Sequence, residues 1–469
     1  MRVRTGIRSG PRRPSRRSLL DVLCATTVAL LVAACDPASV SPGIAILGVN
    51  VVDLEAGVVR PDQTILIIGD TIAAIGPSGA VAVPAGTRRL EGHGRYLIPG
   101  LWDMHTHAHR DGRAAWHHPG YVAYGVTGIR DAGTFADSGT AWRARLRTDT
   151  LAPTVWWGSP PLDGVPPVLS FGVEVATPEA ARASARTFHR AGYRFLKVYD
   201  RLDPESYHAL ADEARLLGIP LEGHVPLRLS PGEVASAGQR TIEHLTLVLE
   251  SCIPGTLDWV AADTSRDAMG LLVDGRLAGA LANYDAGHCV ALFDTLATAG
   301  VWQVPTLVQL RGAFLPPGDP LTRDPRLRGV PAAVREGWVA AQGEWSTAQR
   351  EAGLAVYRRQ LGLVGEMHRA GVPLLAGTDA SDEPWVIPGA SLHDELELFV
   401  EAGLTPVEAL RTATTAPARY RGEPGPLLAP GRRADLVLLA ADPTRGLAAL
   451  RQIEAVILRG RVVERREAS

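Results

Sequence analysis

A short run that begins with apolar residues and ends with two histidines gives the main indication of the fold. It is Leu101-Trp102-Asp103-Met104-His105-Thr106-His107. Residues two apart on a strand share one face, so His105 and His107 are expected to point the same way. Similar runs alternate with helical stretches through the middle of the chain. We count eight of them, at 101–107, 126–131, 154–158, 195–199, 220–224, 241–244, 301–308 and 373–379.

Helical stretches fill the gaps between these runs. Several open with a proline or close at a glycine, among them 178–191, 204–217, 342–370 and 405–414. Apolar strands that alternate with helices are typical of a parallel sheet that is buried on both faces. Eight such strands predict an α/β protein built on a (β/α)8 TIM barrel.

The two ends of the chain carry a different pattern. Short alternating apolar runs, separated by Gly-Asp and Pro-Ala-Gly turns, occupy 45–97, and runs of the same style follow at 434–439 and 455–463. The two ends are therefore expected to complete one small β-sandwich between them.

The first 34 residues have the features of an export signal. Seven arginines precede an apolar run at 19–34, which is shorter than the roughly 20 residues of a transmembrane helix. Leu31-Val32-Ala33-Ala34-Cys35 resembles a lipobox, in which Cys35 becomes the acylated first residue; ordinary signal-peptidase cleavage is the alternative. Ser15-Arg16-Arg17-Ser18-Leu19-Leu20 also resembles a twin-arginine signal. We expect an exported lipoprotein, anchored to the membrane of the bacterial cell envelope by lipid on Cys35.

Four parts of the chain follow from these patterns. They are a lipoprotein signal peptide at 1–34, a lipid anchor and spacer at 35–43, a composite β-sandwich domain at 44–97 and 423–466, and the barrel at 98–422.

Composition limits the class of protein. Hydrophobic residues make up 46% of the 469 positions and charged residues 21%, which is the balance of a soluble α/β enzyme. Seven arginines and one aspartate leave with residues 1–34, so the formal charge changes from −2 to −8, and nothing indicates nucleic-acid binding. Cys252 and Cys289 remain, 37 positions apart. Outside the cytoplasm they can form a disulfide, and two buried free thiols are the open alternative.

Polar side chains cluster where the predicted strands end. Barrel active sites are built at the C-terminal ends of strands, so residues far apart in the sequence can converge there. A single buried histidine is usually a core residue whose hydrogen bonds are made within the protein. That explanation does not account for so many polar residues at the ends of different strands. The candidates are His105, His107, Lys197, His224, His244 and Asp379.

Lys197 is the only lysine in the chain, against 47 arginines. An exposed positive charge can be either residue, but guanidinium cannot replace a primary amine that must react or lose its proton. Lys197 is therefore expected to be retained for its chemistry rather than as a leftover surface charge.

Several motifs together resemble the amidohydrolase superfamily. The opening motif is Pro99-Gly100-Leu101-Trp102-Asp103-Met104-His105-Thr106-His107. Later motifs resemble the branch that contains imidazolonepropionase-like enzymes and metal-dependent, prolidase-like dipeptidases; they are Gly223-His224-Val225-Pro226, Ile242-Glu243-His244-Leu245 and Gly377-Thr378-Asp379-Ala380. Stretches 403–410 and 430–436 match the closing pattern, so the resemblance spans about residues 45 to 465.

The resemblance implies a binuclear metal centre. His105, His107 and Asp379 would hold one divalent ion and His224 and His244 the other, and Lys197 would bridge the two as a carbamate formed with carbon dioxide. Zinc is the leading metal, with manganese, cobalt and iron as alternatives. The implied reaction is hydrolysis of an amide, peptide or cyclic amide C–N bond by a metal-bridging hydroxide, with Asp379 as the catalytic residue that moves the proton.

Three neighbouring positions are expected to support this site. Tyr199 lies two residues beyond Lys197 and should face the same interior, where it would donate a hydrogen bond to substrate. His109, in the loop after the first strand, is a second candidate for substrate contact. Arg130-Asp131 is expected to form a buried ion pair that organises the site.

Other readings of the same residues stay open. A lactonase or a phosphotriesterase-like hydrolase would use the same mechanism, and a ligand-binding lipoprotein without turnover is the alternative from another class. Asp200-Arg201-Leu202-Asp203-Pro204 stands where dipeptidase-like members often have a Gly-Gly loop. The substrate is a small molecule that the sequence does not specify, and this family often forms larger assemblies, so a homo-oligomer is an open expectation.

Overall fold

The computed structural model describes residues 43–109, 112–133, 143–146, 148–263, 267–380, 383–423 and 425–463. The chain divides into two units, Met1–Pro42 and Gly43–Ser469, and every described residue belongs to the second. The predicted signal peptide, its spacer and Cys35 lie outside the described residues. Within the described part, no helix has the length and apolarity needed to cross a membrane.

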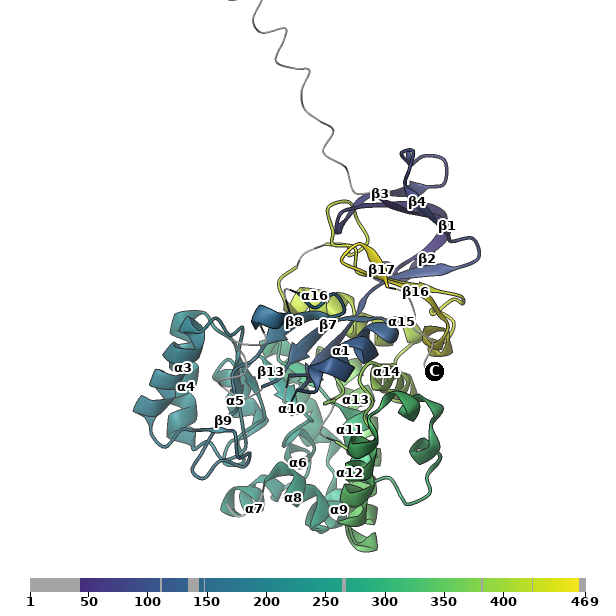
Figure 1. Ribbon diagram of the computed structural model, residues 1–469. Coiled ribbons are helices and arrows are strands. Elements are labelled where there is room, and N and C mark those ends of the chain that lie inside the picture. Colours follow the sequence, from purple (N-terminus) through teal and green to yellow (C-terminus); the bar gives the residue numbers. More distant parts are fainter. Residues whose placement is uncertain are drawn as a thin grey trace, which may run out of the picture. The chain divides into compact units, whose positions relative to one another are not determined.

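Both ends of the described chain meet in one mixed sheet (Figure 1). Its order is β17-β16-β15-β5-β1-β2-β3, and β4 pairs with β1. Strand β15 runs antiparallel to β5, so Leu438 from the C-terminal end lies opposite Leu97 from the N-terminal end. The strands are β1 (Ile44–Asp53), β2 (Val58–Ile68), β3 (Thr71–Pro77), β4 (Arg88–Glu91), β5 (Tyr96–Pro99), β15 (Leu436–Leu439), β16 (Ile453–Leu458) and β17 (Arg461–Val463).

Apolar side chains from both ends close the core of this sheet. Ile46, Ile65 and Ile457 belong to one buried cluster and are fully inaccessible to solvent. The expected union of the two ends is thus present as one continuous sheet. The domain limits at 44–97, 423–466 and 98–422 stay predictions.

Parallel strands carry the rest of the fold. One sheet has the order β6-β7-β8 and another the order β10-β9-β11-β12-β13-β14. Most of their short strands are almost wholly buried, as expected for strands covered on both faces, whereas β8 and β10 are partly exposed. The strands are β6 (Leu101–Thr106), β7 (Val126–Asp131), β8 (Thr154–Trp157), β9 (Leu162–Asp163), β10 (Val173–Glu174), β11 (Leu196–Val198), β12 (Leu221–Gly223), β13 (Thr241–Glu243) and β14 (Trp302–Val304).

Isolated parallel bridges join these two sheets. Gly158, just after β8, pairs with Phe195, just before β11. On the other side, Gln303 of β14 pairs with Leu374, and Ala380 pairs with Thr106 of β6. The segment around 374–380 therefore lies between β14 and β6.

Two of the eight predicted strands differ from the expectation. The run 373–379 is no strand, because the backbone N–H groups of Thr378 and Asp379 both donate to the carbonyl of His105, which breaks the regular ladder. The run 301–308 is a strand only through Val304, because Thr306 takes a left-handed conformation (φ 49°) and α11 (Leu307–Ala313) follows.

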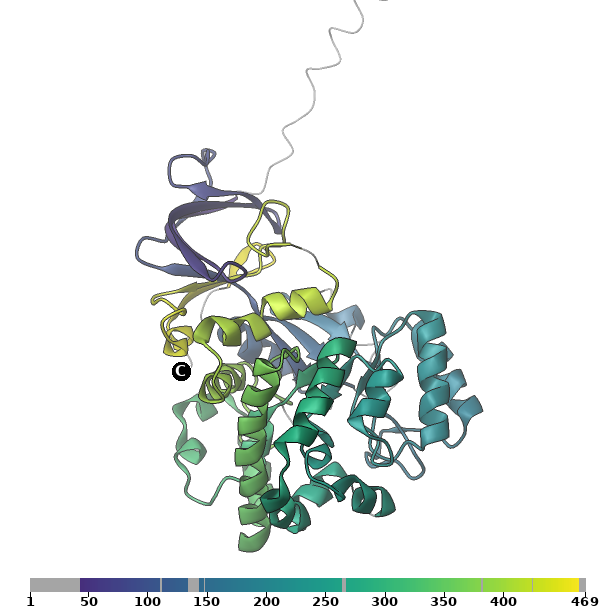
Figure 2. The ribbon, with the colours of Figure 1, turned by 180° about the vertical axis from the view of Figure 1, so that it is seen from behind.

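The helices lie around these parallel strands, as Figures 1 and 2 show from opposite sides. Proline at the first position starts α3 and α4 after the capping residues Thr177 and Asp203, as their sequences predicted. The predicted helix 342–370 is two helices, because Ser346 and Gln349 form a capping box that starts α13. The bounds are α1 (Ala114–Ala123), α3 (Pro178–Arg190), α4 (Pro204–Leu217), α5 (Pro231–Ser236), α6 (Val248–Ser251), α7 (Thr256–Ala262), α8 (Ala268–Val273), α9 (Arg276–Ala280), α10 (Ala286–Ala299), α12 (Ala332–Gly343), α13 (Thr347–Arg369), α14 (Ala390–Glu401), α15 (Pro406–Thr412) and α16 (Thr415–Tyr420).

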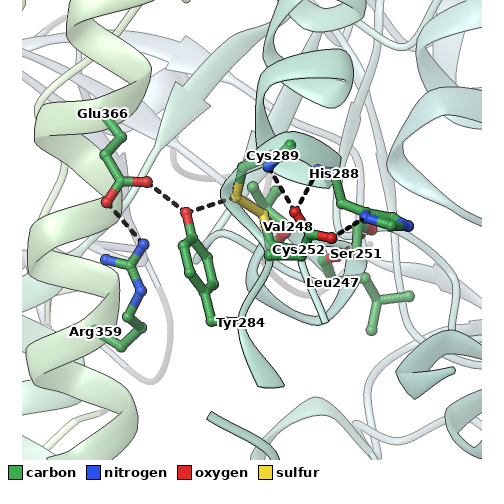
Figure 3. The surroundings of a disulfide bond; sticks show 11 residues. Leu247, Val248, Ser251, Cys252, Tyr284, His288, Cys289, Arg359 and Glu366 are labelled. Atoms are coloured by element: carbon green, nitrogen blue, oxygen red, sulfur yellow. Dashed lines mark hydrogen bonds and ion pairs between the residues drawn. A yellow bond between two sulfur atoms is a disulfide. The ribbon is translucent and has the colours of Figure 1, made fainter. Parts of the chain in front are cut away.

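A disulfide joins Cys252 and Cys289, so the free-thiol alternative is wrong (Figure 3). Cys252 directly follows α6 and Cys289 lies in α10, and both side chains are buried. The hydroxyl of Tyr284 lies 2.8 Å from the sulfur of Cys289 and also contacts Glu366 of α13. The disulfide thereby ties the end of α6 to α10, and the hydroxyl of Tyr284 connects this pair to α13.

Candidate metal centre

Histidines from different strands converge on Asp379. His105 lies on β6 and His107 just after it, and their Nε2 atoms lie 3.5 and 3.0 Å from Asp379 Oδ1. His244 follows β13, and its Nε2 lies 3.9 Å from the other oxygen, Asp379 Oδ2. Ligand atoms of His105, His107 and Asp379 all lie within 4.8 Å of one another, which is a spacing that can hold one metal ion.

The remaining histidine stands next to this group. The ring of His224, which follows β12, lies 5.0 Å from the ring of His244 between centroids, and the ring of His105 lies 4.6 Å from that of His244. Five of the six residues singled out in the sequence therefore form one continuous cluster at the carboxyl ends of the strands.

The backbone is strained where two of these side chains are held. His244 and Asp379 have φ values of 56° and 60°, which side chains other than glycine adopt at a cost in free energy. Gly377 allows the Asp379 segment to approach β6, because a Cβ there would lie 2.8 Å from the backbone nitrogen of His105. Strained backbone of this kind is found at functional sites, where the surrounding structure holds it in place.

Each of the four histidines has a hydrogen-bond partner at its Nδ1 atom. His105 Nδ1 lies 2.6 Å from Glu243 Oε2, and His224 Nδ1 lies 2.5 Å from Asp200 Oδ1. Partners of this kind orient a metal-binding imidazole and make it a better ligand, with Nε2 turned toward the ion. For the other two rings the partners are the Gly133 carbonyl, 3.0 Å from His107 Nδ1, and Thr306 Oγ1, 2.7 Å from His244 Nδ1.

Lys197, on β11, is 1% exposed, and its Nζ has no hydrogen-bond partner within the described part of the chain. Burying a charged amine without a partner is costly. Burial lowers the pKa of Lys197 to about 8, although the carboxylate of Glu243 opposes the shift. An amine that is buried, unpaired and easily deprotonated fits a carbamate that gains metal ions as partners.

The electrostatics of the cluster favour neutral imidazoles around a charged carboxylate. Burial lowers the pKa of His244 to about 3 and that of His105 well below its usual value. Burial would raise the pKa of Asp379, but the neighbouring histidines outweigh it and the net pKa is lowered. Neutral imidazole and ionised carboxylate are the forms that bind divalent cations, so the donor set fits a metal centre.

The two residues predicted to meet substrate lie in different surroundings. The ring of Tyr199 lies 4.1 Å from that of His224, at the edge of the cluster. His109 is fully buried: its Nδ1 lies 2.6 Å from Asp131 Oδ2, and its Nε2 lies 3.1 Å from Nε2 of His118. Substrate contact by Tyr199 and His109 stays a prediction.

Arg130 organises the site, but the partner predicted from the sequence was wrong. Asp131 holds His109, and Arg130 instead binds Glu243 through two hydrogen bonds of 2.8 and 2.7 Å and Glu222 through one of 2.7 Å. All three side chains of this arginine network are fully buried. Since Glu243 also holds His105, the network fixes a candidate ligand. The acidic residues Glu222 and Glu243 inside predicted buried strands could have indicated this network in the sequence, because a buried carboxylate needs a partner.

We expect Arg130→Met to lower the free energy of unfolding by about 3–5 kcal/mol, because it leaves two carboxylates buried without their cation. Urea unfolding followed by circular dichroism measures the change. Arg95→Met is the matched control, since Arg95 forms a surface ion pair with Glu454 at 3.4 Å, where the loss should stay below about 1 kcal/mol. Equal losses in the two variants would contradict the structural role of the network.

Parts of the chain are similar to known proteins. The amidohydrolase family model matches residues 329–464. An uncharacterized protein of Mycobacterium tuberculosis is 39% identical over 106 residues, which are 23% of this chain and only 27% of that protein. The imidazolonepropionase of Chloroflexus aggregans is 27% identical over 431 residues, which cover 87% of this chain and 92% of that protein.

Solved structures share the fold over most of the chain. Bottromycin amidohydrolase superposes with a TM-score of 0.69 at 23% identity, covering 89% of this chain and 86% of that one. A Xaa-Pro dipeptidase with bound methionine in its active site superposes with a TM-score of 0.64 at 17% identity, covering 90% of this chain and all of that one (100%). The match to the amidohydrolase family model is thus confined to residues 329–464, and the likeness to these solved structures extends over the fold of most of the chain.

Proposed function

We propose that this protein is a metal-dependent hydrolase that cleaves an amide, peptide or cyclic amide C–N bond. The observation that carries the proposal is the set of four neighbouring histidines, each with Nδ1 held by a partner, of which His105, His107 and His244 contact the carboxylate of Asp379. The match to the amidohydrolase family model and the similarity to an imidazolonepropionase, a bottromycin amidohydrolase and a Xaa-Pro dipeptidase support this reaction class.

We assign the ligands as follows. His105, His107 and Asp379 hold one ion, His224 and His244 hold the other, and Lys197 carries a carbamate that joins the two. Imidazole and carboxylate donors favour zinc. When bound, such ions lower the pKa of water toward neutrality and polarise a carbonyl group.

The side chains of the protein supply positioning and proton transfer. Asp379 accepts the proton of the attacking water and delivers it to the leaving nitrogen, because its carboxylate faces both histidine groups. Tyr199, beside His224, orients the substrate by a hydrogen bond from its hydroxyl. No serine or cysteine nucleophile is needed.

We also propose that the parallel strands form a closed (β/α)8 barrel. The isolated bridges at 158–195, 303–374 and 106–380 support closure, since they connect β8 to the segment before β11, and β14 to β6 through the segment 374–380. The metal cluster then occupies the C-terminal face of that barrel.

For the location of the protein we propose export and anchoring by lipid on Cys35. The buried Cys252–Cys289 disulfide supports export, because such bonds persist mainly in oxidising compartments. Growth of the producing bacterium with radiolabelled palmitate should label the wild-type protein and leave Cys35→Ser unlabelled; label retained in the variant would refute the anchor.

The decisive experiment for the reaction joins metal analysis to a substrate panel. We expect about two zinc ions per purified chain, as in binuclear hydrolases, and turnover of dipeptides or N-acyl amino acids rather than of lactones or phosphotriesters. Turnover of lactones or phosphotriesters alone would replace the C–N specificity with the alternative reaction. One ion or none after reconstitution with zinc and bicarbonate would refute the binuclear centre.

A further inference from the structure

A helix from a distant part of the chain contacts the candidate metal centre. The backbone N–H of Ala268, the first residue of α8, donates a hydrogen bond of 2.8 Å to Asp200 Oδ2. The other oxygen of the same carboxylate, Oδ1, lies 2.5 Å from His224 Nδ1. The side chain of Asp200 therefore joins α8, 68 positions further along the chain, to a candidate metal ligand.

Both carboxylate oxygens of Asp200 need a partner, because the residue is only 2% exposed. A buried carboxylate oxygen without a donor is costly in free energy. The ring of His224 occupies Oδ1 and the Ala268 N–H occupies Oδ2, so the plane of the carboxylate is fixed at two points. A carboxylate held in this way can keep the imidazole that it contacts in one orientation.

The Ala268 N–H is available because it stands at the start of a helix. The first N–H groups of a helix have no acceptor within the helix itself. In α8 the side chain of the N-cap residue Asp267 accepts the N–H of Gly270 at 2.7 Å. The first turn of α8 thus satisfies one of its own donors and gives another, that of Ala268, to Asp200.

Apolar packing holds α8 in place independently of Asp200. Leu271 is 1% exposed and belongs to the main hydrophobic core. Val273 belongs to a smaller buried cluster with Leu310 of α11 and with Phe314, which directly follows that helix. The position of the Ala268 N–H is therefore determined by contacts that do not include the carboxylate it binds.

The disulfide shown in Figure 3 closes the part of the chain that carries α8. Between Cys252 and Cys289 the described residues include α7, α8 and α9. The Asp285 N–H adds a second link by donating to the Cys252 carbonyl at 2.8 Å. A segment whose two ends are joined has fewer conformations to lose, which favours the contact between its middle and Asp200.

We propose that α8 is a positioning element of the metal centre: the Ala268 N–H fixes Asp200, and Asp200 keeps the ring of His224 in the orientation that binds the second ion. Ala268 acts through Asp200 and His224 and is not itself a ligand. This inference rests on the proposed function for the role of His224 as a metal ligand, but its effect is on zinc affinity and is measured without turnover.

The variant Ala268→Pro tests the contact, because proline has no N–H and is well tolerated at the first position of a helix. The preceding residue, Asp267, already has the extended backbone that suits a residue before proline. We expect the second zinc ion to bind about tenfold more weakly, as on loss of an outer partner of a metal ligand, and the first to bind as in wild type. Competition with a fluorescent zinc chelator, in the presence of bicarbonate, measures both affinities.

Two variants control for the substitution itself. Ala286→Pro places the same residue at the first position of α10, where the side chain is exposed, and should leave both zinc affinities unchanged. Ala268→Ser keeps the N–H and should behave as wild type. The thermal midpoint of the zinc-free Ala268→Pro protein should equal that of wild type, because α8 keeps its apolar packing.

Hydrogen exchange of the wild-type protein supplies a test that does not depend on a variant that folds. Because coupling between two contacts is reciprocal, loading the second zinc ion should slow exchange of the Ala268 amide by the same factor of about ten. Mass spectrometry of overlapping peptides around Ala268, in protein with one and with two zinc ions per chain, measures this change.

Selective weakening of the second zinc ion in Ala268→Pro, together with slower exchange in the two-zinc protein, supports the proposal. Unchanged affinities, an equal loss at both ions, or amide exchange that does not respond to the second ion overturns it. A protein that binds two zinc ions with this dependence on Ala268 but hydrolyses no amide refutes the hydrolase and keeps the positioning role. Turnover with two zinc ions that Ala268→Pro leaves unchanged does the reverse.

Discussion

Replacing Lys197 by arginine is expected to lower the metal content from about two ions per chain to one or fewer and to reduce kcat/KM on the order of 10³-fold or more. Guanidinium keeps the positive charge but does not add carbon dioxide, so the bridge between the two ion sites is lost. Metal analysis after reconstitution with zinc and bicarbonate, together with steady-state kinetics on the best substrate of the panel, measures both effects.

Lys197 is 1% exposed and arginine is larger, so the arginine variant could lose activity through disturbed packing alone. Two further variants separate that effect from the loss of the carbamate. Lys197→Met is close in size and should fail in the same way. Lys197→Ala leaves a space for a short carboxylic acid, so added propionate should restore a measurable part of the activity by supplying the two bridging oxygens. Full activity with two bound ions in Lys197→Arg or Lys197→Met would contradict the carbamate bridge.

Asp379→Asn should lower kcat by about 10²–10⁴-fold, the usual contribution of a positioned proton carrier. The amide keeps the shape and one oxygen ligand but cannot accept the proton of the water. His105 and His107 remain, so at saturating zinc the variant should still bind metal, and KM should change little. Kinetics and metal analysis of the same preparation separate the two roles.

Asp212→Asn provides the matched control for this substitution. Asp212 lies on α4 and its side chain is 56% exposed, so its amide should leave kcat and metal content unchanged. An Asp379→Asn enzyme with near wild-type kcat would contradict proton transfer by Asp379. Complete loss of metal at saturating zinc would instead restrict Asp379 to a ligand role.

Much of the candidate site could be predicted from the sequence because its signals are local. A histidine directly after an apolar strand points to the carboxyl edge of a parallel sheet, whatever the other strands do. His107, His224 and His244 follow this rule, and the structure brings them together with His105, near the end of β6, and with Asp379, whose segment is not a strand. Lys197 stood out by composition alone, as the single lysine of the chain.

Pairings between distant residues could not be predicted in the same way. Arg130 meets Glu222 and Glu243 across 92 and 113 positions, and its sequence neighbour Asp131 turned out to hold a different group. The sequence left the choice between disulfide and free thiols open at Cys252 and Cys289 because it contains no distance between their backbones.

Near neighbours in the chain are enough to predict the alternation of buried strands and helices and the residues at the strand ends, and the composition singles out the unique amine. The partner that holds each imidazole, and the way in which 373–379 departs from a strand to bring Asp379 to His105, depend on contacts between distant parts of the chain. The physical reason is that a buried polar group must find its partner in space, and the chain passes that point from many directions.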